Sequence, residues 1–131
     1  MRLNYSCNGK KLVYMSHPVG NEYERNLGRA LEWWNRLDLR HHETRIFIAP
    51  WFMHVYHAHN TKMLPSYKEL EGILLDDCMM VEACNELVLL GEDRISTGML
   101  KEALRAAACR MPIYRLKTYA DIAEAFDEQR G

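Results

Sequence analysis

Residues Glu86–Glu102, ELVLLGEDRISTGMLKE, decide the predicted fold. The stretch opens with a short apolar run, Glu86–Gly91, and apolar runs of this length are typical of strands buried on both faces of a parallel sheet. A helix is predicted to follow over Ser96–Arg110, because Ser96-Thr97-Gly98 is a helix-capping sequence. The unpaired backbone N–H groups at the start of such a helix favour an anion there.

Glu102 lies just over one turn inside this predicted helix. Counted from Met99, it shares a helical face with Ala103 and Ala106, which must pack on the sheet. A carboxylate on that face needs an explanation, and the spacing leaves two open. Glu102 is either a capping or salt-bridging residue at the helix edge, or a nucleophile or base at the mouth of an α/β cleft.

Strands and helices alternate along the rest of the chain. Strands are predicted at residues 11–16, 45–49 and 112–116, helices at 21–37 and 66–83, an amphipathic C-terminal helix within 117–131, a loop insert at 51–65 and a loose lead-in at 1–10. This alternation predicts a single α/β domain over residues 1–131. Its three-layer, Rossmann-like or flavodoxin-like open sheet would be mostly parallel, with helices on both faces.

In such sheets, ligands bind outside the carboxyl ends of the strands. The loops expected there are His17–Gly20, the segment from Pro50 onward, and Gly91–Gly98. Asp77 falls in the middle of the apolar stripe of the helix predicted at residues 66–83. A carboxylate on a buried stripe is costly unless it is paired or functional. The alternative is a flanking position that reaches solvent at the helix end.

The insert at residues 51–65 combines large apolar side chains with three histidines. It is interpreted as a lid, a substrate wall or a subunit interface, and the sequence does not separate these. The spacing His54-x-x-His57-x-His59 permits a metal site but matches no zinc signature. We therefore expect no metal and no other cofactor, with these histidines at a loop or pocket rim.

Composition limits the function further. The 131 residues carry a formal net charge of −1, which argues against binding to a nucleic-acid polymer. No apolar run is long enough to span a membrane, and no signal-peptide pattern is present. The four cysteines form no CxxC pair, which predicts reduced thiols and a cytoplasmic location.

The segment Ser96–Glu102 has a Ser-x-Gly-x-x-x-Glu pattern. This pattern resembles the nucleoside 2-deoxyribosyltransferase-like superfamily, and most closely its branch of deoxynucleoside 5'-monophosphate N-glycosidases with their phage and bacterial relatives. The resemblance extends over roughly residues 11–116. It includes the opening strand and turn Val13–Pro18, the spacing of Asp77 and Asn85, and Asn26 with Ala30 in the first predicted helix.

The resemblance implies a role for each matching residue. Glu102 would be the nucleophile at the anomeric carbon of a 2-deoxyribosyl group, and Asp77 the partner carboxylate that protonates or holds the departing base. The remaining substrate-binding positions would be Tyr14, Ser16, His17, Asn26, Ser96 and Gly98, with Ser96 and Gly98 holding a 5'-phosphate. The expected substrate is a nucleoside or nucleotide, and the expected assembly a homodimer or larger homo-oligomer.

A second function stays open beside this N-glycosidase or deoxyribosyltransferase activity. The superfamily's first loop is commonly glycine-rich, whereas here it reads His17-Pro18-Val19-Gly20. The insert at residues 51–65 has no counterpart in the superfamily. The alternative is therefore a catalytically silent nucleotide-binding or sensing module of the same fold.

Overall fold

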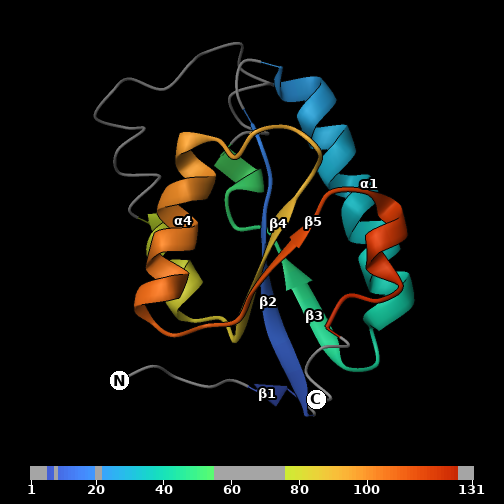
Figure 1. Ribbon diagram of the computed structural model, residues 1–131, viewed down its shortest axis with the longest axis vertical. Coiled ribbons are helices and arrows are strands. Elements are labelled where there is room, and N and C mark those ends of the chain that lie inside the picture. The colour runs from blue at the N-terminus through green and yellow to red at the C-terminus, as the bar shows by residue number, and fades with distance from the viewer. Residues whose placement is uncertain (1–5, 8, 20–21, 55–75, 127–131) are drawn as a thin grey trace.

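The computed structural model describes residues 6–7, 9–19, 22–54 and 76–126 (Figure 1). Its elements are, in chain order, β1 (Ser6–Cys7), β2 (Lys10–Ser16), α1 (Tyr23–His41), β3 (Arg45–Ile48), β4 (Glu86–Leu90), α4 (Thr97–Ala108), β5 (Ile113–Leu116) and the 3₁₀-helix η1 (Tyr119–Ile122). Residues 52–54 and 76–82 are also helical. No helix in these ranges is both long and apolar enough to cross a membrane.

The sheet confirms the predicted α/β fold. Its parallel strands lie in the order β3-β2-β4-β5, and β1 pairs antiparallel with the start of β2. The chain places β3 on one side of β2 and β4 on the other side. The carboxyl ends of β2 and β4 therefore flank a topological switch point, which is where open α/β sheets bind ligands.

Helices cover both faces of this sheet, as predicted. In Figure 1, α1 and η1 lie on one face, and α4 lies with residues 76–82 on the other. The residues of β2 alternate between the two layers. Val13 and Met15 belong to the core cluster that contains Trp33 of α1, whereas Tyr14 belongs to the cluster that contains Met99 of α4.

Asn85 fixes β2 against β4. Its side-chain oxygen accepts a hydrogen bond from the N–H of Leu12 at 2.8 Å, and its own N–H donates to the carbonyl of Leu12 at 2.8 Å. The register that follows places Tyr14 beside Leu87 and Ser16 beside Leu89. This register fixes which residues of β2 face α1 and which face α4.

The C-terminal amphipathic helix is a wrong prediction for the described part of residues 117–131. The chain forms only η1, whose capping box joins Thr118 and Asp121, and Phe126 has a φ of 71° that an α-helix cannot include. Ile122 and Phe126 are buried in the α1-side core. Burial of these side chains has overridden their helical spacing.

Other boundaries also differ from the sequence predictions. β1 lies within the expected lead-in, and its two residues are too few to show a period; they are held by pairing with β2. α1 ends at His41 rather than at residue 37, since the N–H of His42 still donates to the carbonyl of Asp38. Residues 66–75 of the next predicted helix, residues 55–65 of the insert and residues 127–131 lie outside the described ranges.

A buried ion pair closes the amino end of the sheet. The guanidinium of Arg45 donates to both carboxylate oxygens of Glu86, at 2.9 and 3.2 Å, and lies 4.1 Å from the ring centroid of Phe126. The hydroxyl of Tyr114 also donates to Glu86, at 3.1 Å. The exposed fractions of the Arg45 and Glu86 side chains are 11% and 1%, so this contact is largely removed from water.

We expect Arg45→Met to lower the free energy of unfolding by about 3–5 kcal/mol, because it leaves the buried carboxylate of Glu86 without its cation. Arg25→Met is the matched control, since the Arg25–Glu22 pair is exposed and contributes about 0–1 kcal/mol. Urea unfolding of both variants beside the wild type measures the difference. Equal losses in the two variants would contradict a structural role for the buried pair.

Candidate active site

The start of α4 is set by Ser96. The Ser96 hydroxyl accepts a hydrogen bond from the N–H of Met99 at 3.2 Å, which caps the helix as the sequence predicted. The buried residues of α4 are Met99, Glu102 and Ala106, which lie on one face at helical spacing. Glu102 therefore points into the layer between α4 and the sheet and does not lie at an exposed helix edge.

Both oxygens of the Glu102 carboxylate are held by hydroxyl groups of β2. The hydroxyl of Tyr14 donates to Oε2, and that of Ser16 donates to Oε1 at 2.6 Å. Tyr14 and Ser16 are two residues apart in a strand, so their side chains lie on the same face. All three side chains are buried, with 5% of Glu102 exposed. The cluster joins the carboxyl end of β2 to the first turns of α4.

Burial and hydrogen bonding act in opposite directions on Glu102. Burial raises its pKa, the hydroxyls of Ser16 and Tyr14 lower it, and the negative charge of Asp77 raises it, with a net value of about 7. Burial and the neighbouring carboxylates also raise the pKa of Tyr14, which therefore stays a neutral donor. Near neutral pH, Glu102 exists in both its charged and its neutral forms.

Asp77 is the second buried carboxylate of this region. It belongs to helical residues 76–82, and 4% of it is exposed, so the solvent-reaching alternative for this residue is wrong. Burial and the adjacent negative charge of Asp76 together raise the pKa of Asp77 to about 7. Asp77 acts electrostatically on both Glu102 and Tyr14. Two carboxyls of raised pKa thus lie in one buried region.

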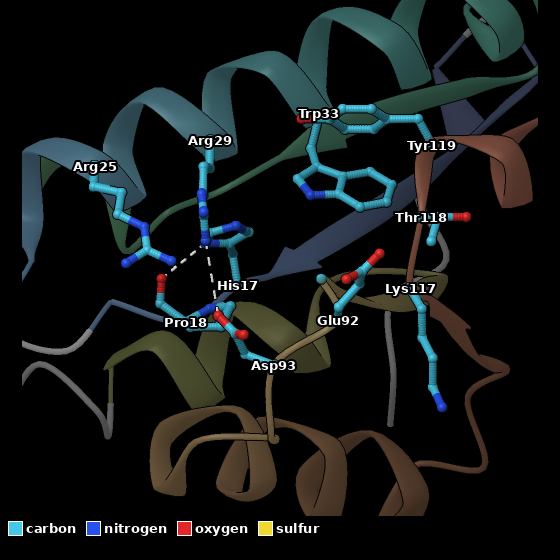
Figure 2. Close-up of a pocket in the computed structure, with 11 residues that line it drawn as sticks. His17, Pro18, Arg25, Arg29, Trp33, Glu92, Asp93, Lys117, Thr118 and Tyr119 are labelled. Carbon is cyan, nitrogen blue, oxygen red and sulfur yellow. Dashed lines mark hydrogen bonds and ion pairs between the residues drawn. The ribbon is translucent and has the colours of Figure 1, made fainter.

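The other predicted site residues have separate positions. Ser96 and Gly98 lie at the start of α4, and both are partly exposed. The side-chain N–H of Asn26 donates to the carbonyl of Val19, so Asn26 holds the loop after β2. His17 lies beyond Ser16 and lines a cavity beside α1 (Figure 2). It is not among the groups that contact Glu102.

Two residues outside the predicted site fix this edge of the sheet. Trp51 belongs to the predicted loop insert, but it is buried, and its indole N–H donates to the carbonyl of Met15 at 2.7 Å. Its ring is stacked with that of His17 at 6.3 Å. Arg115 donates to the carbonyls of Gly91 and Asp93, both at 2.8 Å, and so holds the loop before α4. The sequence feature that could have indicated Arg115 is its place as a charged residue within a short apolar strand.

Within the described ranges, no group of three or more side chains could hold a metal ion. Of the three histidines in the predicted loop insert, only His54 lies in these ranges, where it is exposed. His57 and His59 lie outside them. The expectation that these histidines bind no metal therefore stays a prediction.

The two raised carboxyl pKa values predict how stability depends on pH. The pKa values are about 7 in the folded protein, against ordinary values of 4.5 for Glu and 3.8 for Asp, so the folded protein keeps protons that the unfolded chain releases. The two protonated carboxyls contribute fully to folding stability below their pKa values in the unfolded chain. This contribution is lost as the pH rises through about 7. We expect Glu102→Gln to remove about 3 kcal/mol of this pH dependence between about pH 4 and pH 8.

Urea unfolding at a series of pH values measures this difference between wild type and variant. Glu43→Gln is the control, because Glu43 is exposed. We expect this variant to show the same slope of unfolding free energy against pH as the wild type. An unchanged slope in Glu102→Gln would contradict the assignment of a raised pKa to this residue.

Comparisons with protein-family models, curated proteins and solved structures found no match to this chain. The functional proposal therefore rests on the geometry of the site. A buried carboxylate of α4 accepts hydrogen bonds from two hydroxyls of β2, and a second buried carboxyl lies within its electrostatic reach.

Proposed function

We propose that this chain is an N-glycosidase or deoxyribosyltransferase that cleaves the base–sugar bond of a nucleoside or nucleoside 5'-monophosphate, with Glu102 as its nucleophile. The observation that carries the proposal is the buried Glu102 carboxylate, oriented through both oxygens by Tyr14 and Ser16. Glycosyl transfer uses two carboxyls, and Asp77, whose pKa is also raised, acts electrostatically on Glu102. The Ser96–Glu102 sequence pattern supports the same chemistry.

In the proposed reaction, a Glu102 oxygen forms a bond to the anomeric carbon of the sugar. The bond between that carbon and the base nitrogen breaks, its electron pair stays with the base, and Asp77 supplies the proton. Water or a second base then attacks the anomeric carbon. This step releases the Glu102 carboxylate and returns a proton to Asp77. Tyr14 and Ser16 position the carboxylate for both steps.

The negative charge of Asp77 raises the pKa of Glu102, so these roles belong to one of the two singly protonated forms of the pair. A nucleophile must be ionised and a general acid must be protonated, and each group meets its requirement in part at neutral pH when its pKa is about 7. The two carboxyls interact, so their titration belongs to the pair. Glu102 ionised with Asp77 protonated is the form that we propose to be active.

The start of α4 is the proposed 5'-phosphate site. The Ser96 hydroxyl oxygen accepts a hydrogen bond from the N–H of Met99. The O–H of Ser96 can still donate to a phosphate oxygen. The first backbone N–H groups of α4, including that of Gly98, add donors and a positive dipole end. A ligand at this point would lie on the same helix as Glu102.

The outer surface of α4 supports the proposal of a homo-oligomer. Leu100 and Leu104 are more than half exposed and are four residues apart on this helix, and Met79 is exposed on the neighbouring helical residues 76–82. Exposed apolar side chains at helical spacing are typical of an association surface. In the described part of the chain, Cys78, Cys84 and Cys109 form no disulfide, which is consistent with action in the cytoplasm, our expectation.

One observation favours the alternative of a silent nucleotide-binding or sensing module. Both oxygens of Glu102 already accept hydrogen bonds, and the side chain is almost fully buried. A carboxylate held in this way can serve to join β2 and α4 without reacting. The two functions differ in whether bound nucleotide is cleaved.

The first test is base release from a panel of deoxynucleosides and their 5'-monophosphates. We expect Glu102→Gln to lower kcat/KM about a thousandfold or more, because no covalent intermediate can form on the amide. Glu43→Gln, at an exposed position outside the site, is expected to keep the wild-type rate. Nucleotide binding without base release by the wild type would favour the sensing module.

The second test is the pH profile of kcat/KM. We expect a narrow bell with its maximum near pH 7, since Glu102 must be ionised and Asp77 protonated. Tyr14→Phe removes a hydrogen bond that lowers the pKa of Glu102, so the bell should move to higher pH. Tyr114→Phe is the control, because the hydroxyl of Tyr114 donates to Glu86 at the amino end of the sheet. A bell that does not move in Tyr14→Phe contradicts the assignment.

A further inference from the structure

A cavity of about 340 Å³ opens on the sheet face opposite to Glu102. It lies beyond the carboxyl ends of β2, β4 and β5 and is closed on one side by α1 (Figure 2). Trp33, which forms part of its wall, belongs to the α1-side core, whereas Tyr14 belongs to the α4-side core. Neither Glu102 nor its partners Tyr14 and Ser16 line this cavity. We call it the α1 cavity.

Cationic side chains line the α1 cavity from two directions. Arg25 and Arg29 extend from successive turns of α1, and Lys117 comes from the residues after β5 (Figure 2). Arg25 also pairs with Glu22 at 2.7 Å, and this exposed pair contributes little. The Arg29 side chain is 48% exposed and lies 3.8 Å from the carboxylate of Asp93, a separation at which the pair contributes little. Its guanidinium can therefore bind an anionic ligand. Two neighbouring guanidinium groups favour phosphate, because they donate hydrogen bonds to its oxygens.

An aromatic wall lies beside these cations. The rings of Trp33 and Tyr119 meet edge to face with centroids 4.7 Å apart. The guanidinium of Arg36 lies 4.1 Å from the centroid of the Tyr119 ring. Trp33 is buried, so its ring is fixed by the core before any ligand arrives. Tyr119 is 38% exposed and is held by this contact with Trp33, so its ring offers a planar ligand contact area at a small cost in conformational entropy.

Glu92 and Asp93 add acceptors between the cations and the aromatic wall (Figure 2). Their loop is held by Arg115, which donates to the carbonyls of Gly91 and Asp93. Carboxylates at this position of an α/β sheet can accept hydrogen bonds from sugar hydroxyls. Anionic, planar and hydroxyl-bearing groups would thus each find complementary side chains, and the volume suits a ligand of mononucleotide size.

We propose that the α1 cavity is a binding site for a phosphorylated small molecule with a planar ring and hydroxyl groups, of the nucleotide class. The phosphate contacts Arg25 and Arg29, the ring lies against Trp33 and Tyr119, and the hydroxyls contact Glu92 and Asp93. This site is separate from the Glu102 cluster and does not depend on the reaction proposed there. The molecule can therefore bind one nucleotide on each face of its sheet.

Calorimetric titration with adenosine 5'-monophosphate tests the proposal, with adenosine and inorganic phosphate as partial probes. The titrations use the Glu102→Gln protein, so that cleavage does not consume the probe. We expect the double variant Arg25→Gln/Arg29→Gln to weaken binding at least tenfold, and Tyr119→Ala to weaken it severalfold. Lys101→Gln removes an exposed charge from α4 and is expected to leave this affinity unchanged.

The outcomes separate this site from the proposed active site. Binding that is lost in the double arginine variant and kept in Ser96→Ala supports the α1 cavity, whether or not base release is ever observed. Binding that is lost in Ser96→Ala and kept in the arginine variant assigns the nucleotide to α4 and overturns the proposal. Equal affinity for inorganic phosphate and the nucleotide, or no binding at millimolar concentration, overturns it as well.

Discussion

A carboxylate can be kept in an apolar layer only where hydrogen-bond donors reach its oxygens, and this constraint joins β2 to α4. The donors to Glu102 are the hydroxyls of Tyr14 and Ser16. Because they are neutral, they offset only part of the cost of burial, and the pKa of Glu102 remains raised to about 7. The contact that fixes the helix on the sheet is therefore also the contact that leaves a carboxyl poised between its two charge states.

Glu86 meets the same constraint in a different way. It is as deeply buried as Glu102, but its carboxylate is paired with the guanidinium of Arg45 and also accepts the hydroxyl of Tyr114. An opposite charge compensates a buried carboxylate more fully than a hydroxyl does. Glu86 lies at the amino end of β4, away from the ligand-binding edge, and serves structure. Glu102 has only hydroxyl partners, which leaves its pKa raised.

The alternation of residues along β2 distributes the candidate sites over two faces. Tyr14 and Ser16 turn toward α4, whereas His17, the next residue, lies beside α1 at the opposite cavity. Asn85 fixes this assignment through its hydrogen bonds to Leu12, since a register shift of one residue would exchange the two faces. Trp51 completes the edge by binding the carbonyl of Met15.

The sequence by itself determined the order of the parallel strands along the chain, the start of α4 at Ser96 and the helical face that carries Glu102. These features follow from local patterns, namely apolar runs, a capping residue and spacing along one helix. The sequence also singled out Asp77 and Glu102 as carboxylates on apolar stripes. It could not establish their environment, because the donors to Glu102 come from residues more than eighty positions away.

Only the tertiary structure decided which partners these groups meet. It placed His17 apart from Glu102, moved Trp51 from a predicted loop into the core, and replaced a predicted C-terminal helix with η1. Contacts between distant segments decided each case, and at the C-terminal segment the burial of Ile122 and Phe126 outweighed helix propensity. The raised pKa values have the same origin, since burial is a property of the packed layers.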